Sequence, residues 1–220
     1  MALTPHRSVL DWEEIFFCSF DGMLKPFVQD VATVVRDTTD SYDGDGGCMK
    51  ITTDGITGAI GFASIPVPAH PEICWQTFFR PDSEWQTIGF EFNVRHPTYG
   101  DIDLIVNLMC QTGALTYWNG GAWVPIGTVT LPVWGTTKWN RIAILSDYRL
   151  RSLLVIEING QIFKVLNPAI PVGVTALNHL DIGYHIDTAD GARSTYFDRI
   201  QVWQRAKINK TYGTNPVIII

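Results

Sequence analysis

Short runs of alternating apolar and polar residues dominate the sequence, and each run ends at glycine, proline, asparagine or aspartate. Successive side chains of a β-strand face opposite sides, so this alternation indicates half-buried strands. No stretch has the spacing of a normal helix, and no internal repeat is evident. The pattern spans residues 15–205 and predicts an all-β protein, built as an antiparallel two-sheet sandwich of about twelve to fifteen strands.

The composition is that of one domain. The chain has 220 residues, of which 46% are hydrophobic and 17% are charged, so it can bury a sizeable core. We expect an N-terminal arm over residues 1–14, the sandwich over 15–206 and an apolar tail over 207–220. The four cysteines are widely spaced and form no CxxC pair, which favours buried thiols over disulfides or a zinc site.

Charge and hydropathy exclude several kinds of partner. The net charge is −6 and no lysine or arginine run offsets it, so we expect no nucleic-acid binding. No stretch reaches the eighteen or so apolar residues of a membrane span, so we expect no membrane insertion. The N-terminus lacks the apolar segment of a secretory signal, and we therefore expect synthesis in the cytoplasm without a signal peptide.

Two hairpins are readable, one around Asn-Gly-Gly at 119–121 and one around Asn-Gly at 159–160, because Asn-Gly suits the positive φ of a type I′ turn. Trp118 and Trp123 flank the first turn. Their indoles, with Asn119, are candidates for stacking on a sugar and bonding its hydroxyl groups. The alternative is that both tryptophans pack in the core or at an interface.

Asp198 is the anomalous residue of the last run. Alternation places it on one face with Ile200 and Val202, and a carboxylate among apolar neighbours is costly unless it is paired, hydrogen-bonded or bound to a cation. Either the strand end is wet, or another group neutralises the acid.

The run "KWNRIAILSDYRLRSLLVIEINGQIFKVL" (138–166), then "LDIGYHID" and "STYFDRIQVW", resembles the second half of a concanavalin A-like jelly roll. This is the fold of laminin-G-like modules, carbohydrate-binding modules and some glucanases. The N-terminal "CSFDG" resembles the opening strand of those families. The resemblance implies a jelly-roll sandwich whose first and last strands lie side by side.

The same resemblance implies a structural Ca²⁺ held by an acid from each of those strands. Carried over, the side-chain ligands would be Asp21 and Asp198, and hard oxygen ligands suit Ca²⁺. The alternative is that Asp198 caps a turn, or pairs with Arg199 or Arg193 at a wet strand end.

Glucanases of this fold class carry Glu-x-Asp-x-x-Glu on one strand. Here Asp101 and Asp103 stand at the first two acidic places, but the third is Val106 and no glutamate is nearby in the sequence to act as general acid. The acidic stretch 37–45 lacks the EF-hand order, and the five histidines lack metal-binding spacing. We therefore predict no enzyme.

The last four residues are apolar and would be exposed in a soluble monomer unless they fold back or dock on a neighbour. We take them as assembly contacts: Val217, Ile218, Ile219 and Ile220. The favoured function is a non-catalytic, lectin-like subunit for structure, decoration or attachment in a larger assembly, such as the surface of a phage or virus particle. Its partners would be protein subunits and a surface glycan. The alternatives are a free carbohydrate-binding module and a degenerate glycoside hydrolase.

Overall fold

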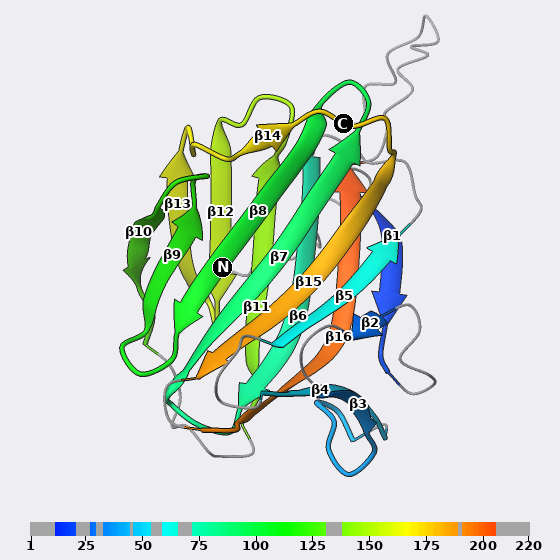
Figure 1. The fold of residues 1–220 in the computed structure, drawn as a ribbon, viewed down its shortest axis with the longest axis vertical. Coiled ribbons are helices and arrows are strands. Elements are labelled where there is room, and N and C mark those ends of the chain that lie inside the picture. The colour runs from blue at the N-terminus through cyan, green and yellow to red at the C-terminus, as the bar shows by residue number, and fades with distance from the viewer. Residues whose placement is uncertain are drawn as a thin grey trace, which may run out of the picture.

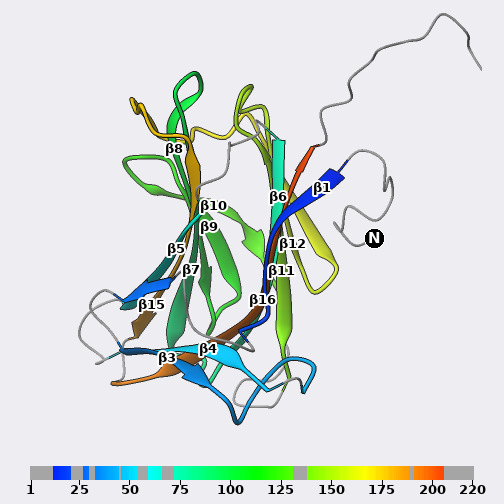
Figure 2. The ribbon, with the colours of Figure 1, turned by 90° about the vertical axis from the view of Figure 1, so that its right-hand side faces the viewer.

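The computed structural model describes residues 12–20, 27–29, 33–44, 46–53, 59–65, 72–130, 138–188 and 191–205. These residues form sixteen strands and no helix, so none of them could cross a membrane as a helix. The strands lie in two antiparallel sheets that face each other (Figure 2). The all-β jelly-roll prediction is confirmed, with slightly more strands than expected.

The first sheet, sheet A, contains eight strands. In spatial order they are β13 (Gln161–Leu166), β12 (Leu153–Ile158), β11 (Asn140–Asp147), β6 (Glu72–Pro81), β16 (Ser194–Arg205), β4 (Cys48–Thr52) and β3 (Thr33–Asp37), with β1 (Trp12–Cys18) also paired to β16. The pairing of β1 with β16 confirms that the first and last strands are neighbours.

The second sheet, sheet B, lies in front of sheet A in Figure 1. Its order is β10 (Trp123–Thr128), β9 (Ala114–Trp118), β8 (Gly100–Met109), β7 (Gln86–His96), β15 (His179–Thr188), β5 (Ala59–Ile65) and β2 (Phe27–Gln29), with β14 (Val172–Gly173) also paired to β8. The central strands β8, β7 and β15 are ten or eleven residues long and carry the candidate site.

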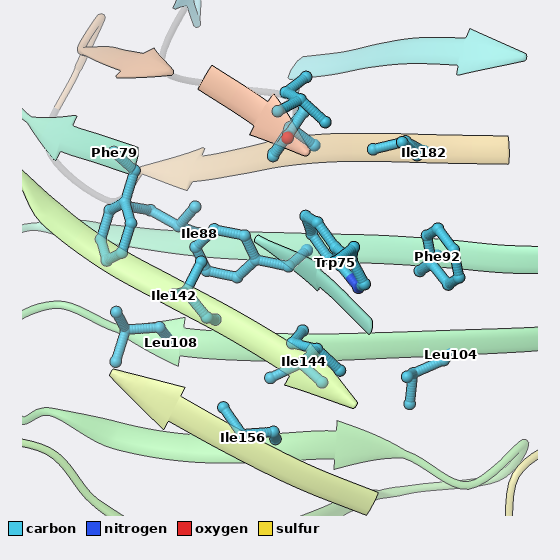
Figure 3. Close-up of a cluster of buried hydrophobic side chains, with 14 of the residues drawn as sticks. Trp75, Phe79, Ile88, Phe92, Leu104, Leu108, Ile142, Ile144, Ile156 and Ile182 are labelled. Carbon is cyan, nitrogen blue, oxygen red and sulfur yellow. The ribbon is translucent and has the colours of Figure 1, made fainter. Parts of the chain in front are cut away.

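The core lies between the sheets and takes every second residue of the central strands. In β7, Ile88, Phe90, Phe92 and Val94 are fully buried. Trp75 of β6 crosses from sheet A and stacks on Phe92, with 5.7 Å between the ring centroids (Figure 3). Because alternate residues of β7, β8 and β15 fill this core, the residues between them point away from it.

The expected turn at 159–160 is present, since Asn159 and Gly160 have φ angles of 51° and 85°. These positive angles match a type I′ turn and join β12 to β13. The four cysteines all lie in the described residues and form no disulfide with one another.

A bulge in β16 corrects the face assigned to Asp198. Asp198 pairs with Phe78 and Gln201 with Gln76, so two residues of β16 stand opposite Thr77 alone. Arg199, with a φ of 49°, is one of the two. The bulge reverses the alternation, so Ile200 and Val202 join the core together with Phe197 rather than with Asp198. Asp198 therefore lies on the outer face of sheet A.

Candidate functional site

Polar and ionisable side chains line the outer face of sheet B, on the residues of β7, β8 and β15 that the core leaves free. We call this group the polar strip. Its members are Glu91, Asn93 and Arg95 of β7, Asp101, Asp103 and Asn107 of β8, and His179, Asp181 and His185 of β15.

The strand register sets these residues side by side. Asn93 lies between Asp103 on β8 and Asp181 on β15. Arg95 lies in the next row, between Asp101 and His179. Residues directly opposite each other have Cβ atoms about 4.5–5.5 Å apart, so each row is one continuous polar surface.

Arg95 is the cationic centre of one end of the strip. Its Nε lies 2.6 Å from Asp181 Oδ2 and its Nη1 lies 3.3 Å from Asp101 Oδ2. His179 Nε2 lies 3.3 Å from the same oxygen of Asp181. These contacts hold two carboxylates of the strip in place.

His185 and Glu91 form a second pair, with 3.2 Å between His185 Nδ1 and Glu91 Oε1. The imidazole lies across Gly89, which is the cross-strand neighbour of His185. A Cβ at position 89 would overlap the ring, so the missing side chain of Gly89 lets the histidine lie flat on the sheet.

Asp103 differs from the other acids, because among the described residues it has no hydrogen-bond or ion-pair partner. It is half-buried. Burial first, and then the nearby charges of Asp101, Glu91 and Asp181, raise the pKa of its carboxyl, against the lowering effect of Arg95. The negative charge of Asp103 is therefore unfavourable, because no donor or cation among the described residues bonds to the carboxylate to offset its burial and the neighbouring acids.

Within the part of the chain that the structure describes, three buried oxygen atoms of the strip have no hydrogen-bond partner: Asn93 Oδ1, Asp101 Oδ1 and Asn107 Oδ1. Asn93, at the centre, is only 7% exposed. Buried acceptors in native proteins almost always have a donor, so these atoms indicate a place where a ligand or water supplies one.

A pocket of about 260 Å³ continues the strip at the far end of the strands from Arg95. Thr87, which lines the pocket, lies between Met109 and Asp187, in the row next to His185. Trp85, which is 45% exposed, is part of its wall. The pocket is therefore part of the same face as the polar strip.

Trp118 and Trp123 also belong to this face. They pair across the β9–β10 hairpin, and their ring centroids are 5.3 Å apart at 57°. Tyr117 is in the core and pairs with Val106, so Trp118 points outward beside the position of Ile105. Asn119 caps the turn, since its Oδ1 accepts the amide N–H groups of Gly121 at 2.9 Å and Ala122 at 2.8 Å. The structure places the predicted pair of indoles at the edge of the polar strip.

Sequence reasoning considered Asp101 and Asp103 but missed their neighbours. Glu91 is distant from Asp103 along the sequence but lies on the adjacent strand. It pairs with Ile105 and is therefore a diagonal neighbour of Asp103. The signal was available in the alternating polar positions of "EFNVRH" and "DIGYH". A motif on one strand does not reveal the polar strip, because β7, β8 and β15 each contribute residues to it.

The structure describes only one of the two predicted calcium ligands. Asp21 lies outside the described residues, and no group of three His, Cys, Asp or Glu residues among them could hold a metal ion. Asp198 is fully buried, so the strand end is not wet. Its Oδ2 accepts the N–H of Tyr42 and its Oδ1 the N–H of Arg199, each at 2.7 Å. These two amide groups stabilise the buried negative charge of Asp198, as a bound cation would. The calcium hypothesis stays a prediction.

The acidic stretch and the apolar residues 217–220 lie away from the polar strip in the sequence. The acidic stretch folds over the outer face of sheet A, where Asp40 pairs with Arg80 and Asp43 with Arg199. The four apolar residues at 217–220 lie outside the described residues.

No protein-family model matches this sequence, and no curated protein matches it either. Several solved structures are similar to it in fold. An endo-β-1,4-glucuronan lyase from the fungus Trichoderma reesei has a TM-score of 0.62 at 13% identity, covering 87% of this chain and 96% of the lyase. The carbohydrate recognition domain of Emp47p has a TM-score of 0.57 at 11% identity, covering 83% and 90%. A β-glucanase from Bacillus licheniformis has a TM-score of 0.55 at 8% identity, covering 87% and 98%.

These likenesses show the fold, which is the concanavalin A-like jelly roll of lectins and glucanases, as the sequence resemblance implied. They include enzymes as well as a recognition domain, so the fold alone leaves catalysis undecided.

Proposed function

We propose that the protein binds a carbohydrate chain on the outer face of sheet B, through the polar strip and the indoles of Trp118 and Trp123. The observation that carries the proposal is the buried, unpartnered Asn93 oxygen at the centre of a polar surface that has an aromatic pair at its edge. Solved proteins of this fold include a carbohydrate recognition domain and enzymes that by name act on polysaccharides.

The chemistry of a sugar fits this surface. Its hydroxyl groups can donate hydrogen bonds to the unpartnered oxygen atoms and can accept them from donors such as Arg95. Its C–H faces are apolar and can pack on an indole, and Trp123 is 42% exposed. Ligand sites commonly combine an aromatic wall with a few placed polar groups.

A glycan array followed by calorimetry tests this proposal. We expect a bound glycan whose affinity falls at least tenfold in Asn93→Ala and in Trp123→Ala. The control is Glu14→Gln, which changes an exposed acid on sheet A. Failure of every glycan to bind, or equal loss in the control, would refute the proposed site.

We propose that binding, rather than glycoside cleavage, is the activity. The third acid of the glucanase pattern is replaced by Val106, which is fully buried in the core. Hydrolysis is nevertheless a second candidate, favoured by the unpaired Asp103 with its raised pKa. Asp103 and Asp181 both stand opposite Asn93, so their strands lie about 10 Å apart, and a pair of acids flanking the sugar is what glycoside hydrolysis requires. Release of reducing ends that Asp103→Asn abolishes would establish hydrolysis.

A role as a structural or attachment subunit of a phage or virus particle remains a proposal. It rests on the apolar sequence of residues 217–220. Light scattering on the full chain and on a chain ending at residue 206 tests it: an oligomer that the truncation dissociates supports assembly, and a monomer in both cases contradicts it.

A further inference from the structure

We propose that the polar strip selects a cationic amino-sugar chain and rejects chains of uronic acids. This inference rests on the proposed function and names the substrate class of the same site.

The charge of the strip is the first argument. It holds the carboxylates of Glu91, Asp101, Asp103 and Asp181, against one permanent cation, Arg95. The two histidines of the strip each contact one of these acids, and they offset the excess only when they are protonated. Asp187 and Glu84 at the pocket add further acids. A uronate carboxylate placed on this surface would be repelled, whereas an ammonium group would be attracted.

The unpartnered atoms are the second argument, and it is independent of net charge. All three are oxygen atoms: Asn93 Oδ1, Asp101 Oδ1 and Asn107 Oδ1. A ligand that displaces water from these atoms must donate hydrogen bonds to them. An ammonium group carries three donors and no acceptor, a hydroxyl carries one donor, and an ionised carboxylate carries none.

Asp103 provides the third argument. Its carboxylate is half-buried, lacks a partner among the described residues and has three acids nearby. A ligand ammonium at this point would add a positive charge to the hydrogen bond that the carboxylate accepts, and it would attract the neighbouring acids as well. A neutral hydroxyl would satisfy the oxygen without relieving the repulsion among the acids.

The size of the face indicates a chain and not a single sugar. The rows run from Asp187 beside Thr87 to His179 beside Arg95. These are eight residue steps along β15, or about 27 Å at the rise of an antiparallel strand. The indoles of Trp118 and Trp123 lie at the β8 side of this length, where a ring face can also attract an ammonium.

The test compares four pentameric ligands of one linkage by calorimetry: β-1,4-linked glucosamine, N-acetylglucosamine, glucose and glucuronic acid. At pH 7 and low salt, where ordinary imidazoles are mostly neutral, we expect glucosamine to bind at least tenfold more tightly than glucose, with glucuronic acid not binding. Added NaCl should reduce the preference, because ion pairing at a partly exposed face is screened. Asp103→Asn and Asp181→Asn should each reduce the preference for glucosamine over glucose at least threefold, and Glu14→Gln should leave it unchanged.

The outcomes separate the two proposals. Equal binding of glucosamine and glucose, or binding of glucuronic acid, overturns the amino-sugar inference while leaving glycan binding intact. Binding of none of the four, together with a blank glycan array, overturns both. Glucosamine binding that survives both strip substitutions shows attraction to the acidic protein as a whole, and also overturns the inference.

Discussion

Replacing Asp198 by alanine removes the acceptor for two backbone amides at once. The N–H groups of Tyr42 and Arg199 both donate to its carboxylate at 2.7 Å, and the side chain is fully buried. A buried donor left without an acceptor costs about 1–3 kcal/mol. Two such donors, less the gain from no longer burying a carboxylate, give an expected loss of about 2–4 kcal/mol.

Asp147 offers a matched control. Its Oδ1 accepts the N–H groups of Arg149 and Leu150, each at 3.0 Å, but in an exposed turn where water can replace it. We expect Asp147→Ala to cost about 1 kcal/mol or less. For a chain of this size, the Asp198→Ala loss corresponds to a fall in Tm of about 4–16 °C.

Thermal and urea unfolding at pH 7 give both values. Equal losses for Asp198→Ala and Asp147→Ala would refute the reasoning, because burial would then make no difference. Melting with EDTA separates the amide account from the calcium hypothesis. A fall in Tm on chelation that Ca²⁺ but not Mg²⁺ reverses, and that Asp198→Asn removes, would favour calcium over the amides.

Three further predictions concern other parts of the molecule. Asp103→Asn should raise stability at pH 7, because the pKa of Asp103 is raised in the folded state and its charged form is therefore destabilising. The gain should shrink as the pH falls toward 3, where the wild-type carboxyl becomes protonated. Thermal melts from pH 7 to pH 3 measure this gain, and a gain that stays constant would contradict the account. Gly89→Ala should displace the His185 ring from Glu91 and weaken glycan binding, measured by calorimetry, with unchanged affinity as the contrary result. Trp75→Ala should cost about 3–5 kcal/mol in urea unfolding, since Trp75 is 1% exposed and packs on Phe92 in the core; a loss below about 1 kcal/mol would contradict this packing.

The fold was largely predictable from the sequence, because alternation and turn residues act locally. The Asn159–Gly160 turn and the alternating core of β7 follow from residue types alone. The bulge at Arg199 did not, since an extra residue leaves no compositional mark and reverses the faces on either side of it. The environment of Asp198 was missed for this reason.

The candidate site was only partly predictable. Asp101 and Asp103 lie on one strand and were visible as a pair, whereas Glu91 and Asp181 reach them from two other strands. Which polar residues meet depends on the strand order and register, and single-strand motifs carry no information about either. Trp118 and Trp123 were found because one short hairpin holds both.

Amide NMR spectra recorded during titration with the glucosamine pentamer would locate the bound chain directly. We expect shifts confined to the outer face of sheet B, in 87–95, 101–107 and 179–187, together with the indole N–H signals of Trp118 and Trp123. The indole signal of the buried Trp75 should stay in place. Shifts gathered on β1, β6 or β11 of sheet A, with the polar strip unchanged, would contradict the assignment of this face as the binding site.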